Sequence, residues 1–250
     1  MKPMLRLLLP GFLLLPLAAQ NKVWTDEEVM RVHRSTLLID GHNDVTSRTV
    51  RGWDIASEKD ARHTSIGKLR AGGVGAQFFA AYVSASFIDS GGSARRALEM
   101  IDTIRHDIVA RHPDHFTLAV TADQIEAAHR AGKIAALIGI EGGHAIENEP
   151  RLLRAFYDLG VRYMTLTHTR NLSWAGSSAE KDERGLDELG RRIIAEMNRL
   201  GMMVDIAHVS DKTFWDVIEA SRAPVFSSHS SARALSDIPR NLADDMIRAI

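Results

Sequence analysis

Short apolar segments alternate with longer amphipathic segments over most of this chain, and this alternation constrains its fold more than any other feature. The apolar segments are residues 36–39, 74–83, 134–140, 161–166, 202–206 and 224–226. Continuous apolar runs are typical of strands buried on both faces, as in a parallel sheet covered by helices. About six strand–helix units in succession favour a barrel over an open sheet. We therefore predict an α/β fold of the (β/α)8 TIM-barrel-like class.

The segments between the predicted strands carry residues that are typical of helix ends. Thr121, Asn148 and Ser210 can each cap the start of a helix. A last helix is predicted to begin at Asn241 and to continue to the end of the sequence. Because a full barrel needs eight units, we expect residues 20–250 to form the N-terminal portion of a barrel domain, incomplete and truncated at residue 250.

The first 20 residues have the pattern of an export signal. Lys2 and Arg6 precede an apolar stretch over residues 7–17, and two alanines follow it, which are small residues that a signal peptidase accepts. We predict a signal peptide over residues 1–19 and an exported protein, periplasmic or secreted. The alternative is an uncleaved N-terminal segment that would hold the protein at a membrane, although the apolar stretch is short for a membrane span.

Charge and cysteine content exclude several classes of function. The 31 basic residues are balanced by 32 acidic residues, so the formal net charge is -1. We expect no nucleic-acid partner, because such a partner requires a broad basic surface. The chain has no cysteine, which removes thiolate metal ligands and a cysteine nucleophile. Metal or acid–base chemistry must therefore use the 11 histidines and the carboxylates.

Histidine and acidic side chains follow most of the predicted strands. Because the active sites of barrel enzymes lie at the carboxyl ends of their strands, we expect these side chains to meet in one pocket. They are His42, Asp44, Glu141, His168, His208 and His229. Imidazole and carboxylate groups suit Zn²⁺ and similar ions. We predict that all of them except His168 are metal ligands, because this set fits two ions that share a carboxylate.

Taken alone, each of these residues has an ordinary structural explanation. His42 and Asp44 could belong to a loop or a cap, and an acidic residue at a strand end is often structural. Three histidines at consecutive strand ends are less readily explained in this way. We expect His144 to orient a loop. The remaining histidines are predicted to lie at the surface: His33, His63, His106, His112, His115 and His129.

A series of motifs along the chain resembles that of a known family. The motifs are IDGHNDV (39–45), IGIEGGHAIEN (138–148), YMTLTHTRNLSW (163–174), MVDIAHVSDKTF (203–214), SSHSSARAL (227–235) and PRNLADDMIRAI (239–250). The family that they resemble is that of the membrane dipeptidases, which are renal dipeptidase-type zinc metallopeptidases. The resemblance implies a metallopeptidase barrel with two zinc ions per chain. It also implies that dipeptides are cleaved by a hydroxide that the two ions share.

The same resemblance implies which residue binds which ion. His42 and Asp44 would bind one zinc ion, and His208 and His229 would bind the other. Glu141 would bridge the two ions and take part in catalysis.

The resemblance further implies two substrate-binding residues. His168 would bind the substrate and act in catalysis by polarising the peptide oxygen. Arg240 would bind the terminal carboxylate, which limits substrates to short peptides. The family's acid–base aspartate lies on a last strand that this sequence does not contain. The cysteines of the animal members are also absent, so a homo-oligomer stays an open expectation.

Two other interpretations stay open. One is a different binuclear-metal barrel amidohydrolase that acts on cyclic amides, lactones or β-lactams, although that class usually begins with a His-x-His pair and bridges its metals with a carboxylated lysine. The other is a catalytically inert metal-binding fragment of the parent barrel. Arg240 has an alternative of its own, which is a surface ion pair with Asp237, Asp244 or Asp245.

Overall fold

The computed structural model describes residues 23–60, 62–182 and 184–250, in two units divided between Ser35 and Thr36. The described part of the first unit is residues 23–35, which contain helix α1 (Asp26–Ser35), and this helix has no buried residue. At its start the Glu28 N–H donates to Thr25 Oγ1 (3.2 Å) and the Thr25 N–H donates to Glu28 Oε2 (3.0 Å), a reciprocal cap. The predicted signal peptide lies outside the described residues. Within the described ranges, no helix is long and apolar enough to cross a membrane.

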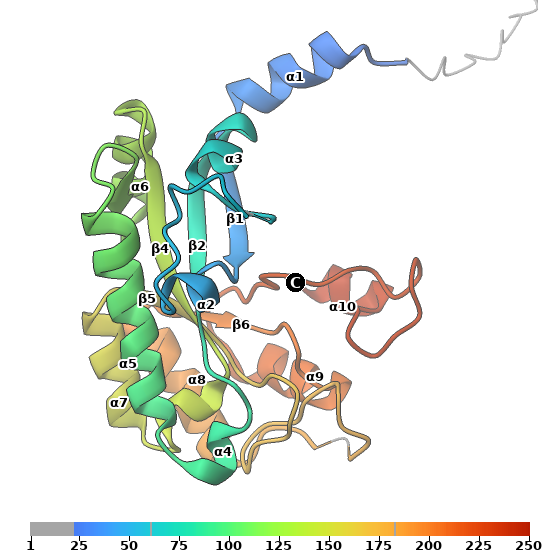
Figure 1. Cartoon of the computed structure of the whole chain (residues 1–250). Coiled ribbons are helices and arrows are strands. Elements are labelled where there is room, and N and C mark those ends of the chain that lie inside the picture. Colours follow the sequence, from blue (N-terminus) through green and yellow to red (C-terminus); the bar gives the residue numbers. More distant parts are fainter. Residues whose placement is uncertain (1–22, 61, 183) are drawn as a thin grey trace, which may run out of the picture. The chain divides into compact units, whose positions relative to one another are not determined.

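In the described part of the second unit, six parallel strands form one sheet (Figure 1). They are β1 (Leu38–Asn43), β2 (Val74–Tyr82), β3 (Phe116–Leu118), β4 (Ile134–Glu141), β5 (Val161–Thr165) and β6 (Met203–Asp205). Their order is β1-β2-β4-β5-β6, and β3 pairs with the start of β4. The predicted α/β class is confirmed, as a curled parallel sheet that forms half of a barrel.

The helices between the strands pack mainly on one face of the sheet, and Figure 1 shows α5 and α7 along that face. The helices of this unit are α2 (Thr46–Thr49), α3 (Ile66–Ala71), α4 (Phe87–Ser90), α5 (Ser93–Thr103), α6 (Ala122–Arg130), α7 (Pro150–Asp158), α8 (Glu188–Leu200), α9 (Asp211–Ala220) and α10 (Asp244–Ala249). A π-helical turn, Ile104–Ala110, extends α5, and a 3-10 turn, Gly143–Ile146, follows β4.

Two of the predicted helix caps are confirmed. The Thr121 hydroxyl accepts a hydrogen bond from the Gln124 N–H (3.3 Å) at the start of α6. The Ser210 hydroxyl accepts one from the Thr213 N–H (3.1 Å) at the start of α9. Each side chain satisfies an N–H group that has no partner within its helix.

Two predicted helix starts are wrong. Glu149, rather than Asn148, caps α7, because its carboxylate accepts a hydrogen bond from the Arg151 N–H (3.0 Å). Asn241 does not begin a helix, since α10 begins at Asp244. The Asn241 amide instead donates to the Ser236 carbonyl oxygen (2.8 Å) and so closes a turn.

The strand predictions also need two corrections. Residues 224–226 form no strand, and only a single bridge joins Phe226 to Asp205 at the end of β6. Pro224 has no N–H to donate, which shortens the possible ladder. The sequence analysis did not predict β3, a strand of three residues in which only Phe116 is buried. Such a short segment carries too little periodicity to be recognised.

Successive residues of the central strands are buried on opposite faces of the sheet. Phe79 and Ile138 join the main core beneath the helices, whereas their neighbours Phe78 and Leu137 join a smaller cluster on the other face. Because both faces are apolar, the strands contain no polar alternation. This double burial explains the continuous apolar runs in the sequence.

Polar residues come into register where the central strands end. Tyr82 of β2 pairs with Glu141 of β4, Glu141 pairs with Thr165 of β5, and Thr165 pairs with Asp205 of β6. Glu141 lies four residues after Leu137 and therefore projects from the same face as the smaller cluster. The register thus places a polar row across the carboxyl ends of four strands.

One glycine allows the close packing beneath this row. Gly139 pairs with Tyr163 on the neighbouring strand, and a Cβ atom at Gly139 would lie 2.0 Å from Cζ of Tyr163. The absence of a side chain at Gly139 leaves room for the fully buried Tyr163 ring. The Tyr163 hydroxyl thereby reaches His42 Nδ1, at 2.9 Å.

Gly139→Ala is expected to lower the free energy of unfolding by about 1–3 kcal/mol, because the added methyl group overpacks a close contact. Urea unfolding measures this change. The matched test is the same substitution in a Tyr163→Leu background, where the ring that the methyl group meets is gone and the cost of the alanine should fall. Equal costs in the two backgrounds would contradict this explanation.

Candidate metal centre

Glu141 lies at the centre of the predicted site. It is the last residue of β4 and its side chain is 4% exposed. Its Oε1 atom faces His208 Nε2 (3.1 Å) and His229 Nε2 (3.3 Å), whereas its Oε2 atom faces His42 Nε2 (3.6 Å). The structure therefore brings three predicted histidines from separate parts of the sheet to the two oxygens of one carboxylate.

His42 and Asp44 approach Glu141 from β1. His42 lies within the strand and Asp44 directly after its end, and Asp44 Oδ1 is 3.4 Å from His42 Nε2. His42 is held from behind, because its Nδ1 atom contacts the Tyr163 hydroxyl at 2.9 Å. Its Nε2 atom is buried and has no hydrogen-bond partner among the described residues. Buried nitrogen atoms are rarely left in this state.

Close approach of two backbone segments places His229 beside β1. A Cβ atom at Gly41 would lie 2.7 Å from the carbonyl oxygen of Ser228. The glycine therefore lets β1 lie directly against the segment that carries His229. As a result the rings of His42 and His229 stack with their centroids 3.9 Å apart.

His208 reaches the site from an unusual backbone conformation. Its φ angle is 67°, in the left-handed region that residues other than glycine seldom adopt. The His208 carbonyl accepts hydrogen bonds from Thr167 Oγ1 (3.1 Å) and the Ser178 N–H (2.8 Å), which hold the turn. The His208 Nε2 atom then lies 3.0 Å from His229 Nε2. Backbone strain of this kind is often found at functional sites.

The charge on Glu141 is fixed by the histidines. Burial acts to raise the pKa of this carboxyl group, but the nearby imidazole groups of His208, His229 and His42 outweigh burial and hold the pKa far below its usual range. Glu141 therefore stays ionised at neutral pH. A buried carboxylate that cannot be neutralised by a proton requires a compensating positive charge.

The histidines respond to burial in different ways. Burial acts to lower the pKa of His42, but the nearby carboxylates of Asp44 and Glu141 raise the pKa to about 9. Burial prevails for His208 and His168, whose pKa values are lowered. The position between the two carboxylates therefore favours a cation, whether a proton on His42 or a metal ion in its place.

These side chains have the chemistry of a metal site. The ligand atoms of His42, Glu141 and His229 lie within 4.8 Å of one another, and so do those of Glu141, His168 and His208. Imidazole nitrogen and carboxylate oxygen are the ligands that zinc-type ions prefer in proteins that lack cysteine. Together with the partnerless His42 Nε2 atom, this donor set fits a divalent cation.

His168 lies beside the proposed ligands. Its Nε2 atom is 3.8 Å from Glu141 Oε1, and its ring packs edge-on against Tyr82 with the centroids 4.9 Å apart. A cavity of about 290 Å³ opens here and is lined by Asp44, Ser47, Tyr82, Glu141, His168, His208 and His229. The sequence analysis did not single out Tyr82, because it ends an apolar run and has the character of a core residue.

Arg240 lies on the same side of the site as His229. Its guanidinium donates to the His229 carbonyl oxygen (2.5 Å) and to Ser230 Oγ (2.7 Å). Its charge also acts to lower the pKa of His208. No carboxylate among the described residues lies within 4.0 Å of Arg240, so the alternative of a surface ion pair with Asp237, Asp244 or Asp245 is wrong.

The other histidines lie away from the centre. His144 is buried and its Nε2 atom contacts the Ser84 carbonyl oxygen at 3.1 Å, which agrees with the predicted role in loop orientation. His112 was predicted at the surface, but its side chain is only 13% exposed and contacts Asp54 Oδ1 at 2.8 Å. The hydrogen bond with Asp54 explains its burial, and the sequence carries no sign of that distant partner.

Sequence analysis missed an acidic residue behind the site. Asp205, the last residue of β6, is fully buried and accepts hydrogen bonds from the Ser228 N–H (2.9 Å) and Ser228 Oγ (2.7 Å). It lies near the end of the apolar segment 202–206, which is close to the signal that identified Glu141. The signal cannot show whether such an acid faces the metal ligands or supports one of them.

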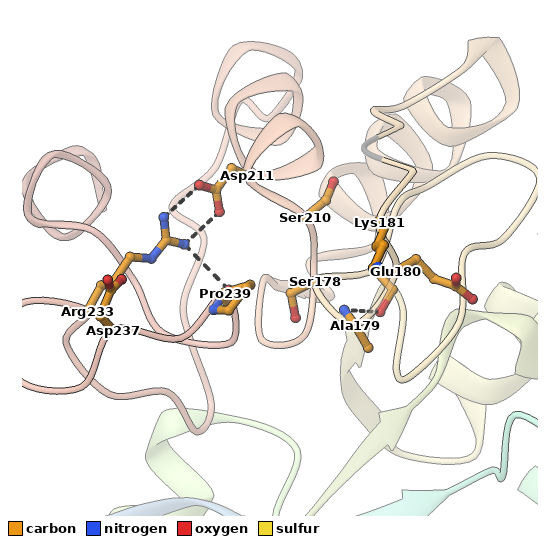
Figure 2. A pocket seen from close by; sticks show the side chains of 10 residues that line it. Ser178, Ala179, Glu180, Lys181, Ser210, Asp211, Arg233, Asp237 and Pro239 are labelled. Atoms are coloured by element: carbon orange, nitrogen blue, oxygen red, sulfur yellow. Dashed lines mark hydrogen bonds and ion pairs between the residues drawn. The ribbon is translucent and has the colours of Figure 1, made fainter.

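A second cavity, of about 410 Å³, lies beside the loop that supports His208 (Figure 2). Figure 2 shows Arg233 paired with Asp211 on one side and Ser178, Glu180 and Lys181 on the other. Both Arg233–Asp211 contacts are 2.7 Å long. The charged groups of Arg233 and Asp211 thus satisfy each other.

Known relatives cover most of this chain. The family model for membrane dipeptidases (peptidase family M19) matches residues 26–250. Dipeptidase 3 of Rattus norvegicus is 38% identical over 236 residues, which is 90% of this chain and 47% of the relative. Dipeptidase verJ of Clonostachys rogersoniana is 40% identical over 228 residues, which is 84% of this chain and 58% of the relative. The chain spans about half the length of the curated relatives it matches.

Solved structures also resemble the fold. A metallo peptidase from Rhodobacter sphaeroides, liganded with a phosphinate mimic of the dipeptide L-Ala-D-Ala, matches 86% of this chain and 70% of its own, with a TM-score of 0.74 and 28% identity. An amidohydrolase from Pseudomonas aeruginosa matches 88% of this chain and 61% of its own, with a TM-score of 0.72 and 26% identity.

Proposed function

The chain belongs to the membrane dipeptidase family, peptidase family M19, and from this premise we propose that it carries the metal site of a zinc-dependent dipeptidase. The observation that carries the proposal is the division of ligands around Glu141. His208 and His229 face one of its oxygens, and His42 faces the other. A carboxylate whose two oxygens each face histidine nitrogen atoms is suited to bridge two metal ions.

Two zinc ions per chain fit this division. His42 and Asp44 would hold one ion with Glu141 Oε2, and His208 and His229 would hold the other with Glu141 Oε1. Two bound ions would supply a nucleophile at neutral pH and polarise the peptide carbonyl. The low pKa of Glu141 supports the bridging role, because the ligand stays ionised over the physiological range.

His168 is proposed to act on the substrate carbonyl. Its side chain lines the cavity, and its lowered pKa keeps the imidazole neutral near pH 7. A neutral imidazole can donate one hydrogen bond to the oxygen on which negative charge develops. One donor of this kind typically contributes about 3–4 kcal/mol to stabilisation of the transition state.

Arg240 is proposed to bind the terminal carboxylate of the substrate. A guanidinium can hold a carboxylate through two parallel hydrogen bonds, and no described carboxylate occupies Arg240. The distance between Arg240 and the metal ligands would then set the length of the substrate. The phosphinate mimic of L-Ala-D-Ala bound by the Rhodobacter sphaeroides protein supports a dipeptide.

Export of the protein is proposed on separate grounds. Residues 1–19 have the charge and apolar pattern of a signal peptide. The family description as membrane dipeptidases supports a location outside the cytoplasm. N-terminal sequencing of the mature protein tests the proposed cleavage after Ala19.

The proposed function predicts that metal removal abolishes turnover. Dialysis of the full chain against a chelator should stop the hydrolysis of dipeptides, and added zinc should restore activity and about two ions per chain, as expected for a binuclear hydrolase. Dipeptide turnover and metal content are measured on the same samples.

His106→Ala is the matched control for this experiment. His106 is an exposed histidine that pairs with Asp102 on its own helix, so the variant should keep both ions. Dipeptide hydrolysis by metal-free protein would contradict the proposed function. Hydrolysis of a lactone or β-lactam, with none of dipeptides, would instead favour a different binuclear amidohydrolase.

A further inference from the structure

We propose that Asp205 and Ser228 are positioning residues that fix which ring nitrogen of His229 faces Glu141, an inference that rests on the metal site proposed above. Within the part of the chain that the structure describes, neither residue lines the cavity, and neither side chain hydrogen-bonds to a proposed ligand other than His229. They act through His229.

Four hydrogen-bond donors surround the Asp205 carboxylate. It is fully buried at the end of β6. Its Oδ1 atom accepts hydrogen bonds from the N–H groups of Ala207 (3.1 Å) and Ser228 (2.9 Å). Its Oδ2 atom accepts from the hydroxyl groups of Thr165 and Ser228, the latter at 2.7 Å. The four donors satisfy the carboxylate, so its orientation is fixed.

The number of available protons then determines which group donates in each hydrogen bond between Asp205, Ser228 and His229. A carboxylate can only accept, so the single hydroxyl proton of Ser228 must point to Asp205. Ser228 Oγ also lies 2.7 Å from His229 Nδ1. Because the Ser228 hydroxyl donates its only proton in the hydrogen bond to Asp205, its oxygen can only accept a hydrogen bond from His229 Nδ1. His229 must therefore carry its proton on Nδ1.

This tautomer leaves the other nitrogen of His229 free to bind metal. Its Nε2 atom has a lone pair and lies 3.3 Å from Glu141 Oε1. A metal-binding histidine usually donates its second N–H to a carboxylate or another acceptor, and that contact fixes the ring and strengthens the ligand. Here the carboxylate of Asp205 acts through one serine hydroxyl.

A parallel contact supports His42. The Tyr163 hydroxyl lies 2.9 Å from His42 Nδ1 and so holds this ring from behind. This support does not depend on the Ser228 contact with His229 Nδ1. The loss of the Ser228 hydroxyl would therefore loosen the orientation of the His229 ring, whereas other contacts of Asp205 would remain.

The decisive measurement is the tautomer of His229. Nitrogen-15 NMR of the metal-free full chain should show the proton of His229 on Nδ1. Ser228→Ala should remove this preference and weaken zinc affinity by about 10–100-fold, the usual effect of losing such a support. Zinc affinity is measured by competition with a chelator. Ser228→Thr keeps a hydroxyl group and should retain both properties.

Thr165→Val is the matched control. Thr165 donates to the same Asp205 oxygen as Ser228 does, but its hydroxyl makes no hydrogen bond with a histidine among the described residues. Its loss should destabilise the fold to a similar degree and leave the His229 tautomer unchanged. A merely structural role for Ser228 would give the two variants the same zinc affinity.

Two results would overturn the inference. One is a proton on Nε2 of His229 in the unaltered metal-free chain, and the other is a zinc affinity in Ser228→Ala that matches Thr165→Val. Failure of the proposed function looks different. The unaltered chain would then bind no zinc. The tautomer of His229 observed by NMR would still decide whether Ser228 positions His229 or has a merely structural role.

Discussion

Glu141→Gln should remove both metal ions and reduce dipeptide hydrolysis by at least about 10³-fold, since loss of metal assistance removes several kcal/mol of transition-state stabilisation. The substitution keeps the size of the side chain but replaces an anionic oxygen with an amide nitrogen. A neutral amide is a poor ligand for zinc-type ions. Because the histidines face both oxygens of Glu141, one substitution should weaken both positions at once.

His208→Ala provides the comparison for this variant. It removes a proposed ligand of one ion only, so about one ion per chain should remain, as expected for two positions that are filled separately. Metal content per folded chain is the measurement, and circular dichroism shows that each variant is folded. Retention of two ions by Glu141→Gln would show that Glu141 does not bridge.

Arg240→Ala should lower kcat/KM for free dipeptides by roughly 30-fold to several-thousand-fold, because the loss of a charged, hydrogen-bonded pair costs about 2–5 kcal/mol. Unaltered protein should show a loss of the same size when the C-terminal carboxylate of the substrate is amidated. The variant should then lose little more on the amide, because the amide cannot use the guanidinium. The kcat/KM of Arg240→Lys for free dipeptides should lie between those of unaltered protein and Arg240→Ala, since lysine keeps the charge but lacks the planar guanidinium group.

Arg240 also donates to the His229 carbonyl oxygen, so its loss has a second consequence to separate. Metal content should stay unchanged if the effect is on substrate alone. Arg233→Ala is the matched control, because Arg233 lies on the same loop and is already paired with Asp211. Its ratio of rates on acid and amide should equal that of unaltered protein. Equal rates of unaltered protein on acid and amide would exclude the carboxylate-binding role.

Most of the strands, and the candidate residues that follow them, could be predicted from the sequence. The central strands are buried on both faces, so they leave continuous apolar runs, and each run marks the carboxyl end of a strand. Glu141, His168 and His208 could be identified as candidates because each comes within two residues of the end of such a run. The helix caps at Thr121 and Ser210 could also be predicted, since each side chain contacts a backbone group only three residues away.

The support of the site could not be predicted in this way. Asp205 and Ser228 are 23 residues apart, and His42 and Tyr163 are 121 residues apart. Their contacts depend on the register between strands, which no local pattern encodes. The residues involved are a serine, a tyrosine and an aspartate, and each of these has many ordinary positions in a fold.

The sequence by itself determined the class of fold, most of the strands and the set of candidate ligands. Only the tertiary structure decided how these residues are arranged. It showed that Gly41 and Gly139 permit close approach of neighbouring segments, that residues 224–226 form a single bridge, and that Arg240 contacts the His229 carbonyl instead of an aspartate. The physical reason is the range of the interactions. Strand burial and helix capping depend on residues that are close together in the sequence. The orientation of side chains within a site depends on contacts between segments that only the folded chain brings together.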